Sequence, residues 1–328
     1  MSLFAGALFV LFSIAGSQAA GAPGSCESAN ETAILASPLA PWKGAPLRVV
    51  ITAEKPFEGE LSLIGPDGRV AAKSAERRGG PPYFWYAEVA KPAAGSWRAT
   101  LAHSDASAGC STIIREFTVS NAKPPTPHAT SGSVWPVRSA WNRDNENLYS
   151  AWIEKLFDAP LDAAPSWKAL HEVLRDQSRN MLYNHLGLGE DSANLVIRPD
   201  CADLPYFLRA YFAFKMGLPF GYAKCTRGGG GDAPKCPAWW NIEKEEPRPI
   251  APEEQLVASG GGAVFGMFGQ PAAPPPVAAP RKLPPQRPAG LVPGFGFYLR
   301  NTIADGVHSG SGRTAFDDNN TDYYPVPL

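Results

Sequence analysis

The spacing of apolar residues changes in kind at a stretch rich in Pro, Thr and Ser, residues 121–133. Before this stretch, short apolar runs alternate with turn residues, which is typical of an antiparallel β-sandwich. After it, apolar residues recur every three or four positions, as they do on one face of a helix. We therefore expect a multidomain chain, with an all-β sandwich at 26–120, a linker at 121–134 and an α+β domain at 135–328.

The first half is expected to hold five strands, at 47–51, 61–64, 83–89, 97–101 and 113–119. The last two strands, with Cys110 between them, resemble the final hairpin of an immunoglobulin-like or fibronectin-like module. Nothing in this half points to catalysis. We expect a spacer or docking module that binds a partner in the cell envelope.

The N-terminal residues 1–20 have the features of a secretory signal peptide. An uncharged apolar run is followed by small residues, with Ser17 and Ala19 at the positions that cleavage requires. A retained N-terminal anchor is the alternative, because the segment before the run carries no Lys or Arg. No later segment approaches the roughly 20 apolar residues of a membrane span. We expect an exported protein, periplasmic or extracellular, with no stable membrane span.

The charges nearly cancel, with 30 basic and 31 acidic residues, so nucleic acid is not an expected partner. The glycine run at 228–231 lacks the Lys-Ser/Thr ending of a phosphate-binding loop. His171 and His185 have no partner at metal-ligand spacing, and we expect them to be solvated or at the edge of the core. The sequence therefore predicts no cofactor and no metal site.

Five cysteines are an odd number for an exported protein. Their spacing favours one pair between Cys26 and Cys110 and a second between Cys225 and Cys236, which leaves Cys201 free. Other pairings stay open, including one between Cys201 and Cys225, because sequence alone does not fix the connectivity.

Two helices are expected after the linker. The first covers 143–157, with Asp144 or Asn145 as its cap, and the second covers 166–186, with Ser166 as its cap. Both precede the stretch that carries the candidate chemistry.

A third helix is expected to begin at or beside Cys201. Pro199 does not continue a preceding helix, Asp200 suits an N-cap, with Asp203 as the alternative cap or as a residue that orients substrate, and Gly217 is a stop signal. Apolar residues cover most of the circumference between these limits, which predicts a buried helix. A thiol in its first turn meets the positive end of the helix dipole, which favours the nucleophilic thiolate. The alternative for Cys201 is a small buried apolar residue.

The residues Asp200, Cys201, Ala202 and Asp203, which open this apolar helix after two earlier helices, resemble the nucleophile segment of the papain-like thiol hydrolases. The similarity covers about residues 135–225 and is greatest to the NlpC-like cell-wall cysteine peptidases and their transglutaminase-like relatives. The resemblance implies a papain-like α+β domain with a cysteine nucleophile, a histidine on a later strand and a polar residue that orients the histidine. It also implies cleavage of peptide or amide bonds, in the NlpC-like branch those of peptidoglycan.

The chain departs from this family pattern at the histidine. His308 is the only histidine after Cys201, and it lies in a stretch typical of turns and loops. Asp317, Asp318 or Asp322 follows it, so a triad of Cys201, His308 and Asp322 has the family's order.

Residues 226–296 are rich in Gly and Pro, and we expect them to form a long disordered insertion. Few strands are expected after the third helix, although a papain-like core needs a sheet packed on it. The apolar run at 323–328 is typical of an extended segment. We therefore expect a chain truncated at its C-terminus, with the true histidine beyond residue 328 as the alternative to His308.

These observations favour an exported cysteine peptidase or amidase acting on peptide bonds, with peptidoglycan as its substrate. The alternative is a non-catalytic scaffold or binding protein of the cell envelope that keeps a degenerate hydrolase fold. The two differ in whether Cys201 is an activated nucleophile.

Overall fold

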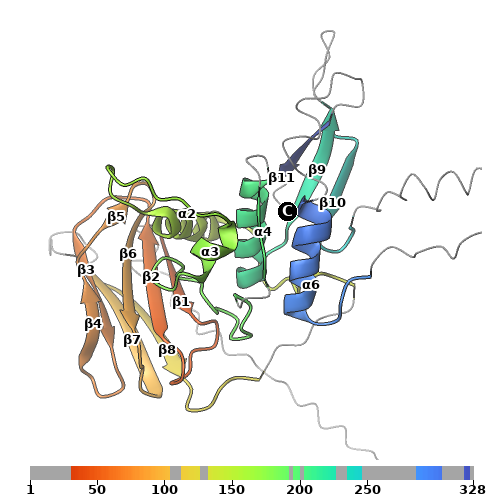
Figure 1. Cartoon of the computed structure of the whole chain (residues 1–328). Helices are drawn as coiled ribbons and strands as arrows, with labels where there is room; N and C mark the ends of the chain where they lie inside the picture. Colours follow the sequence, from red (N-terminus) through yellow and green to blue (C-terminus); the bar gives the residue numbers. More distant parts are fainter. Residues whose placement is uncertain are drawn as a thin grey trace, which may run out of the picture.

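A computed structural model describes most of the chain, and Figure 1 shows a β-sandwich beside a group of helices and a small separate sheet. The described residues are 31–103, 112–125, 132–191, 195–199, 203–226, 235–245, 286–304 and 321–325. The expected signal peptide, Cys26 and Cys110 lie outside them.

The sandwich is built from two four-stranded sheets whose strands all pair antiparallel. The strands are β1 (Thr32–Ser37), β2 (Leu47–Ala53), β3 (Gly59–Ile64), β4 (Val70–Ser74), β5 (Arg78–Gly79), β6 (Tyr83–Val89), β7 (Gly95–His103) and β8 (Thr112–Val119). One sheet has the order β1-β2-β6-β5 and the other β4-β3-β7-β8. This order is that of an immunoglobulin-like sandwich, with one strand added to the second sheet.

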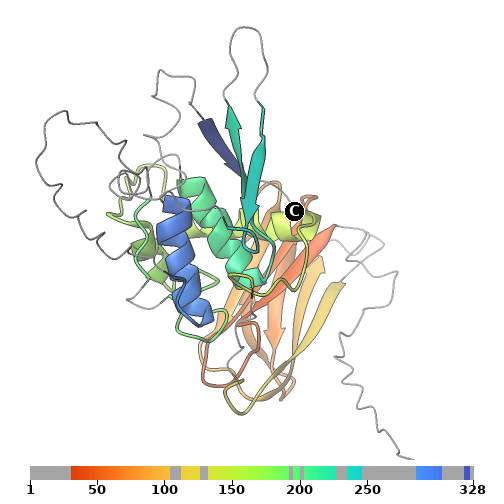
Figure 2. The ribbon, with the colours of Figure 1, turned by 90° about the vertical axis from the view of Figure 1, so that its right-hand side faces the viewer.

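The five predicted strands correspond to β2, β3, β6, β7 and β8, whereas β1, β4 and β5 were not predicted. Side chains of β3 alternate between buried and half-buried, as expected for a sheet with one face on the core. All seven residues of β2 are buried. A strand that is buried on both faces needs a second layer outside the sandwich, and the helices supply it (Figure 2).

The first helix, α2 (Arg143–Phe157), has the predicted bounds. Its N-cap is Asn142, whose side chain accepts a hydrogen bond from the Asn145 N–H at 2.9 Å. The prediction of Asp144 or Asn145 as the cap was therefore wrong. The cap lies two or three residues earlier than predicted because Asn142 is extended and its side chain satisfies a free N–H of the first turn.

The predicted helix at 166–186 was wrong in length and cap. The structure has only α3 (Leu170–Arg175), and its N-cap is Ala169, without a side-chain hydrogen bond, rather than Ser166. The chain then turns because Asp176 accepts a hydrogen bond from the Ser178 N–H at 2.9 Å. Such local side-chain hydrogen bonds offer the backbone an alternative to the helix.

A three-stranded antiparallel sheet follows the long apolar helix α4 (Leu204–Met216). It has the order β10-β9-β11, from β9 (Gly221–Thr226), β10 (Ala238–Asn241) and β11 (Thr321–Pro325). The expectation of few strands after this helix was therefore wrong. The strands are short and separated by long stretches of chain, so no regular spacing revealed them.

The expected disordered insertion at 226–296 contains ordered structure. Strand β10 lies within it, and so does the first part of α6 (Leu291–Tyr298), which a π-helical turn, η1 (Leu299–Ile303), continues. Helix α6 folds despite its Pro and Gly residues because its aromatic side chains are buried. Phe295 is stacked on Phe214 of α4, with ring centroids 4.0 Å apart.

The sandwich and the helices share one hydrophobic core. Ala33, Val50 and Phe84 of the first sheet belong to the same buried cluster as Trp152 of α2 and Phe212 of α4. A second cluster, around residues such as Trp85, fills the sandwich interior. The outer face of the β1-β2-β6-β5 sheet is therefore not free for a partner.

Candidate active site

Helix α4 is buried on almost every side, as predicted. Its N-cap is Asp203 and not Asp200, because the Asp203 carbonyl accepts the first helical hydrogen bond, from the Phe207 N–H at 3.0 Å. Pro205 lies in the first turn, where its missing N–H costs nothing. Cys201 and Asp200 lie outside the described residues, and in the sequence Cys201 comes two residues before the N-cap.

A short segment at 195–199, which we call the strap, leads toward Cys201 and is held by α3. The Nδ1 atom of His171 lies 3.1 Å from the Ile197 N–H nitrogen and 3.0 Å from the Ile197 carbonyl oxygen. Arg175 donates a hydrogen bond from Nη2 to the Leu195 carbonyl at 2.8 Å. His171 is buried and is bonded to the backbone, so it is not the solvated residue that we expected as one alternative.

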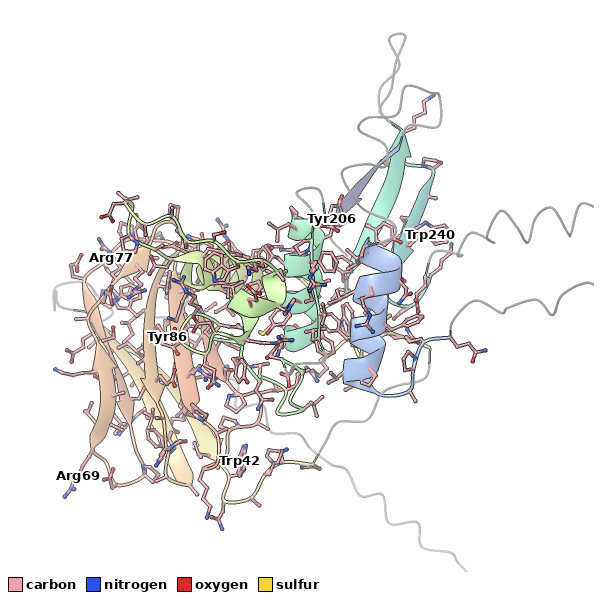
Figure 3. The ribbon with its side chains drawn as sticks, in the orientation of Figure 1. Trp42, Arg69, Arg77, Tyr86, Tyr206 and Trp240 are labelled. Atoms are coloured by element: carbon pink, nitrogen blue, oxygen red, sulfur yellow. The ribbon has the colours of Figure 1, made fainter. Side chains whose placement is uncertain are left out.

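The three-stranded sheet lies beside α4, and β11 is close to the N-terminal end of this helix in both ribbon views (Figures 1 and 2). Figure 3 shows Tyr206 in the first turns of α4, at the end that faces β11. The backbone of Asp322, the predicted acid, is in β11 and pairs with Cys225 of β9. His308, Asp317 and Asp318 lie outside the described residues.

Cys236 is disulfide-bonded. Its expected partner, Cys225, follows Lys224, which pairs with Ala238 of β10. This register brings the backbones of the two cysteines close together, as their expected pairing requires. Cys225 also pairs with Asp322 in the register of β9 and β11, so the backbone of the candidate acid lies opposite that of Cys225.

The C-terminal half of α4 carries a buried ion cluster that the sequence analysis missed. Lys215 Nζ lies 2.6 Å from both Glu190 Oε1 and Asp191 Oδ2, and all three side chains are at most 1% exposed. Burial alone would raise the pKa of Glu190, but attraction to Lys215 and a hydrogen bond from it outweigh burial and lower this pKa. Two features of the sequence could have indicated a buried charge: Lys215 lies in an apolar stretch, and Glu190 and Asp191 are consecutive acidic residues.

The cluster extends into the core through hydrogen bonds between side chains. Tyr211 donates to Asp191 at 2.7 Å, Asn180 donates to Tyr211 at 2.8 Å, and Trp152 donates to Asn180 at 3.0 Å. Burial, followed by the charge of Asp191 and the hydrogen bond to it, raises the pKa of Tyr211 well above its usual value. Tyr211 is therefore a fixed hydrogen-bond donor. The network supports the C-terminal half of α4, away from the N-terminal end of this helix.

His185 lies between this cluster and the sandwich. It is fully buried, with Nδ1 3.0 Å from the Ser37 hydroxyl, and its carbonyl accepts from the Leu39 N–H at 2.8 Å. Burial and the nearby charge of Lys215 lower the pKa of His185 to about 3. A neutral, fully buried histidine has a structural role. Our expectation of a solvated or core-edge position for His185 was therefore wrong.

A pocket of about 540 Å³ opens at the other end of α4. Arg138, Pro219 and Ile242 are among its lining residues, and the Arg138 N–H donates to the carbonyl of the C-cap Gly217 at 2.7 Å. Because the helix has 13 residues, its two ends are about 20 Å apart. This pocket is therefore distinct from the backbone that leads to Cys201.

Within the residues described, no group of three or more His, Cys, Asp or Glu side chains is arranged to hold a metal ion. In the same part of the chain, no helix has both the length and the apolar character needed to cross a membrane.

No family model matches the chain, and no curated protein matches it in sequence. One similar solved structure is the Ig1 domain of mouse SynCAM 2, with 10% identity and a TM-score of 0.20, covering 28% of this chain and 98% of that domain. Another is chitinase ChiW from Paenibacillus sp. str. FPU-7, a cell-surface-expressed multi-modular enzyme, with 16% identity and a TM-score of 0.21. That match covers 27% of this chain and only 8% of the chitinase.

Proposed function

We propose that this protein is an exported cysteine hydrolase that cleaves peptide or amide bonds, with Cys201 as its nucleophile. The observation that carries the proposal is the position of Cys201, two residues before the N-cap of a helix that is buried on almost every side. The unpaired N–H groups of a helix start favour an adjacent thiolate over the thiol. The resemblance to papain-like hydrolases also calls for an antiparallel sheet after this helix, and β9, β10 and β11 supply one in that chain order.

In the proposed reaction the Cys201 thiolate attacks the carbonyl carbon of the scissile amide, and the backbone N–H of Cys201 helps to hold the resulting oxyanion. The tetrahedral intermediate collapses when the leaving amine takes a proton from His308. Water, deprotonated by His308, then hydrolyses the thioester and regenerates the thiol. Asp322 has the role of orienting His308, from a strand that pairs with the one following α4.

The proposed substrate is the peptide part of peptidoglycan, reached in the periplasm or outside the cell. This choice rests on the resemblance to NlpC-like peptidases and on the signal-like N-terminus. The immunoglobulin-like module is joined to the helices by a common core. We therefore assign this module a structural role, in which it stabilises the hydrolase domain.

The rate of Cys201 alkylation by iodoacetamide, followed against pH by mass spectrometry, tests the proposal. We expect a titration midpoint well below 8, since an ordinary thiol titrates near 8.5. Cys201→Ala is the control for labelling at other thiols. Incubation with peptidoglycan stem peptides should then give cleavage that Cys201→Ser abolishes. A Cys201 that is disulfide-bonded, or that reacts only after unfolding, would refute the nucleophile role.

A non-catalytic envelope protein is the second candidate, and one surface favours it. The outer face of the β4-β3-β7-β8 sheet carries exposed apolar side chains, with Val70 and Ile114 exposed by 55% and 51%. A partner would bind this face, because the other sheet is covered by the helices. This alternative would be supported if Ile114→Lys lost binding of an envelope partner while Cys201→Ser bound the partner as the wild type does.

A further inference from the structure

We propose that the pocket at the C-terminal end of α4 binds a small zwitterion with an apolar side chain, either a free amino acid or a short peptide. Arg138 would hold its carboxylate and Glu243 its ammonium group, and both residues line the pocket. The inference does not depend on Cys201. The pocket lies at the other end of α4, and the structure describes every residue that lines it.

One wall of the pocket belongs to the segment 135–141, which is tied to the chain that follows α4. Two tryptophans mark the ends of this segment. The ring N–H of Trp135 donates to the Leu218 carbonyl at 2.8 Å, and that of Trp141 donates to the Pro219 carbonyl at 2.7 Å. These bonds fix both ends of the segment, so the wall between them has a defined position.

Arg138 lies between the two tryptophans and is held against the end of α4. Its N–H donates to the Gly217 carbonyl at 2.7 Å. Its side chain packs on the same glycine, because a Cβ atom added there would lie 2.7 Å from Arg138 Nε. Burial lowers the pKa of Arg138 below its usual value, and no carboxylate of the described residues pairs with it. A positioned cation of this kind binds a ligand carboxylate at a small cost in side-chain entropy.

The negative charge comes from Glu243, on a tight turn that follows β10. The turn is closed by Asn241, whose Oδ1 accepts from the N–H groups of Glu243 at 2.9 Å and Lys244 at 2.6 Å. The next residue, Ile242, is 1% exposed, and its N–H donates to the Phe220 carbonyl at 3.2 Å. Glu243 therefore stands on a fixed backbone. Its side chain is exposed and forms no ion pair with another residue that the structure describes.

The rest of the lining is largely apolar, with Val137, Ala140, Pro219 and Ile242. Val137 is 44% exposed although its segment is fixed at both ends. A concave site with apolar walls, a few polar groups and a volume of about 300–1,000 Å³ is typical of small-molecule binding. The volume here is about 540 Å³.

The two charges and the apolar lining together define the class of ligand. Arg138 and Glu243 line one pocket without pairing with each other. A ligand that carries a carboxylate and an ammonium group would satisfy both charges, and an apolar side chain would cover the exposed surface of Val137. Free amino acids and short peptides have this chemistry.

Isothermal titration calorimetry with leucine and with leucyl-leucine tests the proposal, and the tighter of the two shows which source the pocket fits. The better ligand is then compared with its N-acetylated derivative, which lacks the ammonium group, and its amidated derivative, which lacks the carboxylate. We expect each derivative to bind the wild type about tenfold or more weakly than the parent ligand, since each has lost one charged hydrogen-bonding group.

Two substitutions then assign each charged group of the ligand to its residue. Arg138→Gln should weaken the parent ligand about tenfold and leave the amidated derivative unchanged. Glu243→Gln should weaken the parent ligand about as much and leave the N-acetylated derivative unchanged. Arg69→Gln is the matched control. Arg69 is an exposed arginine of the sandwich, far from α4 (Figure 3), so this variant should bind as the wild type does.

Binding of neither ligand at up to about 10 mM would overturn the proposal. Unchanged binding in both pocket variants would overturn it as well, because the ligand would then bind elsewhere. Thermal unfolding shows whether each variant is folded. If Arg138→Gln fails to fold, Glu243→Gln decides, and an unchanged affinity for the parent ligand in that variant overturns the proposal. No step of the test uses the reactivity of Cys201, so failure of the proposed hydrolase is a separate result.

Discussion

At the scale of single residues, Lys215 is a charged group whose side chain is fully buried. It is an ammonium group inside the core, with two carboxylates as its partners. Removing one partner of a buried ion pair leaves the others as uncompensated buried charges. Lys215→Met should therefore lower the free energy of unfolding by about 3–5 kcal/mol, measured by urea denaturation.

The control for this prediction removes the carboxylate charges as well. Glu190→Gln and Asp191→Asn keep oxygen acceptors for the loop N–H groups that Glu190 and Asp191 now bind. Adding both to Lys215→Met should restore a large part of the lost stability. A single Lys215→Met variant that loses less than about 1 kcal/mol would show that the cluster does not behave as a buried ion pair.

His185 makes a second prediction at this scale, on the effect of pH. Its pKa is about 3 in the folded protein, against about 6.5 when unfolded. The unfolded state therefore binds the extra proton first, and stability is lost as the pH falls from 6.5 toward 3. At pH 4.5 the loss from this group should be about 2–3 kcal/mol.

The measurement is urea denaturation at pH 7 and pH 4.5 for wild type and His185→Asn. Asparagine keeps a polar group near Ser37 and does not titrate, so the variant should lose about 2–3 kcal/mol less between these pH values. Carboxylates titrate in both proteins and cancel in the comparison. Equal acid sensitivity in the two proteins would mean that His185 is not held neutral.

At the scale of elements, the cap of α2 gives a direct test of the helix boundary. Asn142→Ala removes the side-chain acceptor for the Asn145 N–H and should cost about 1 kcal/mol of unfolding free energy. Asp144→Ala removes only a charge from the first turn and should cost less than about 0.5 kcal/mol. The reverse order would place the cap where the sequence pattern predicted it.

The elements also show what the sequence reveals and what it does not. Helix α2 and strand β6 have their predicted bounds because their periodicity is regular and their ends are marked. The helix expected at 166–186 is shorter because Asp176 and Asn180 form turns with their own backbone, which competes with a helical periodicity. The burial of α4 was predictable, but the partners of Lys215 were not, since Glu190 and Asp191 reach it only through the tertiary fold.

The candidate site was predictable to a smaller extent. The sequence places Cys201 near the start of a buried helix, and the structure confirms the helix from Leu204. Sequence reasoning missed the role of His171 as a backbone anchor because its partner, Ile197, contributes only backbone atoms. No pattern of side chains encodes such a contact.

At the scale of the whole molecule, the shared core makes one folding unit of two parts that differ in class. Strand β2 is buried on both faces, toward the sandwich interior and toward the helices. Arg48 of this strand is 3% exposed and donates to the Tyr183 carbonyl at 3.1 Å. A sheet that is covered in this way does not separate from the helices without exposing a large apolar surface.

We therefore expect the protein to unfold in one cooperative transition, with equal calorimetric and van't Hoff enthalpies. Leu61→Ala in the sandwich interior and Phe212→Ala in the helical core should each shift this transition as a whole, with losses of about 2–5 kcal/mol. Differential scanning calorimetry on the oxidised protein measures both. If Leu61→Ala instead splits the transition in two, with the second part unmoved, the sandwich unfolds by itself. The module would then be a spacer, and its contacts with the helical part, Arg48 to Tyr183 and Ser37 to His185, would not matter to the stability of the helices.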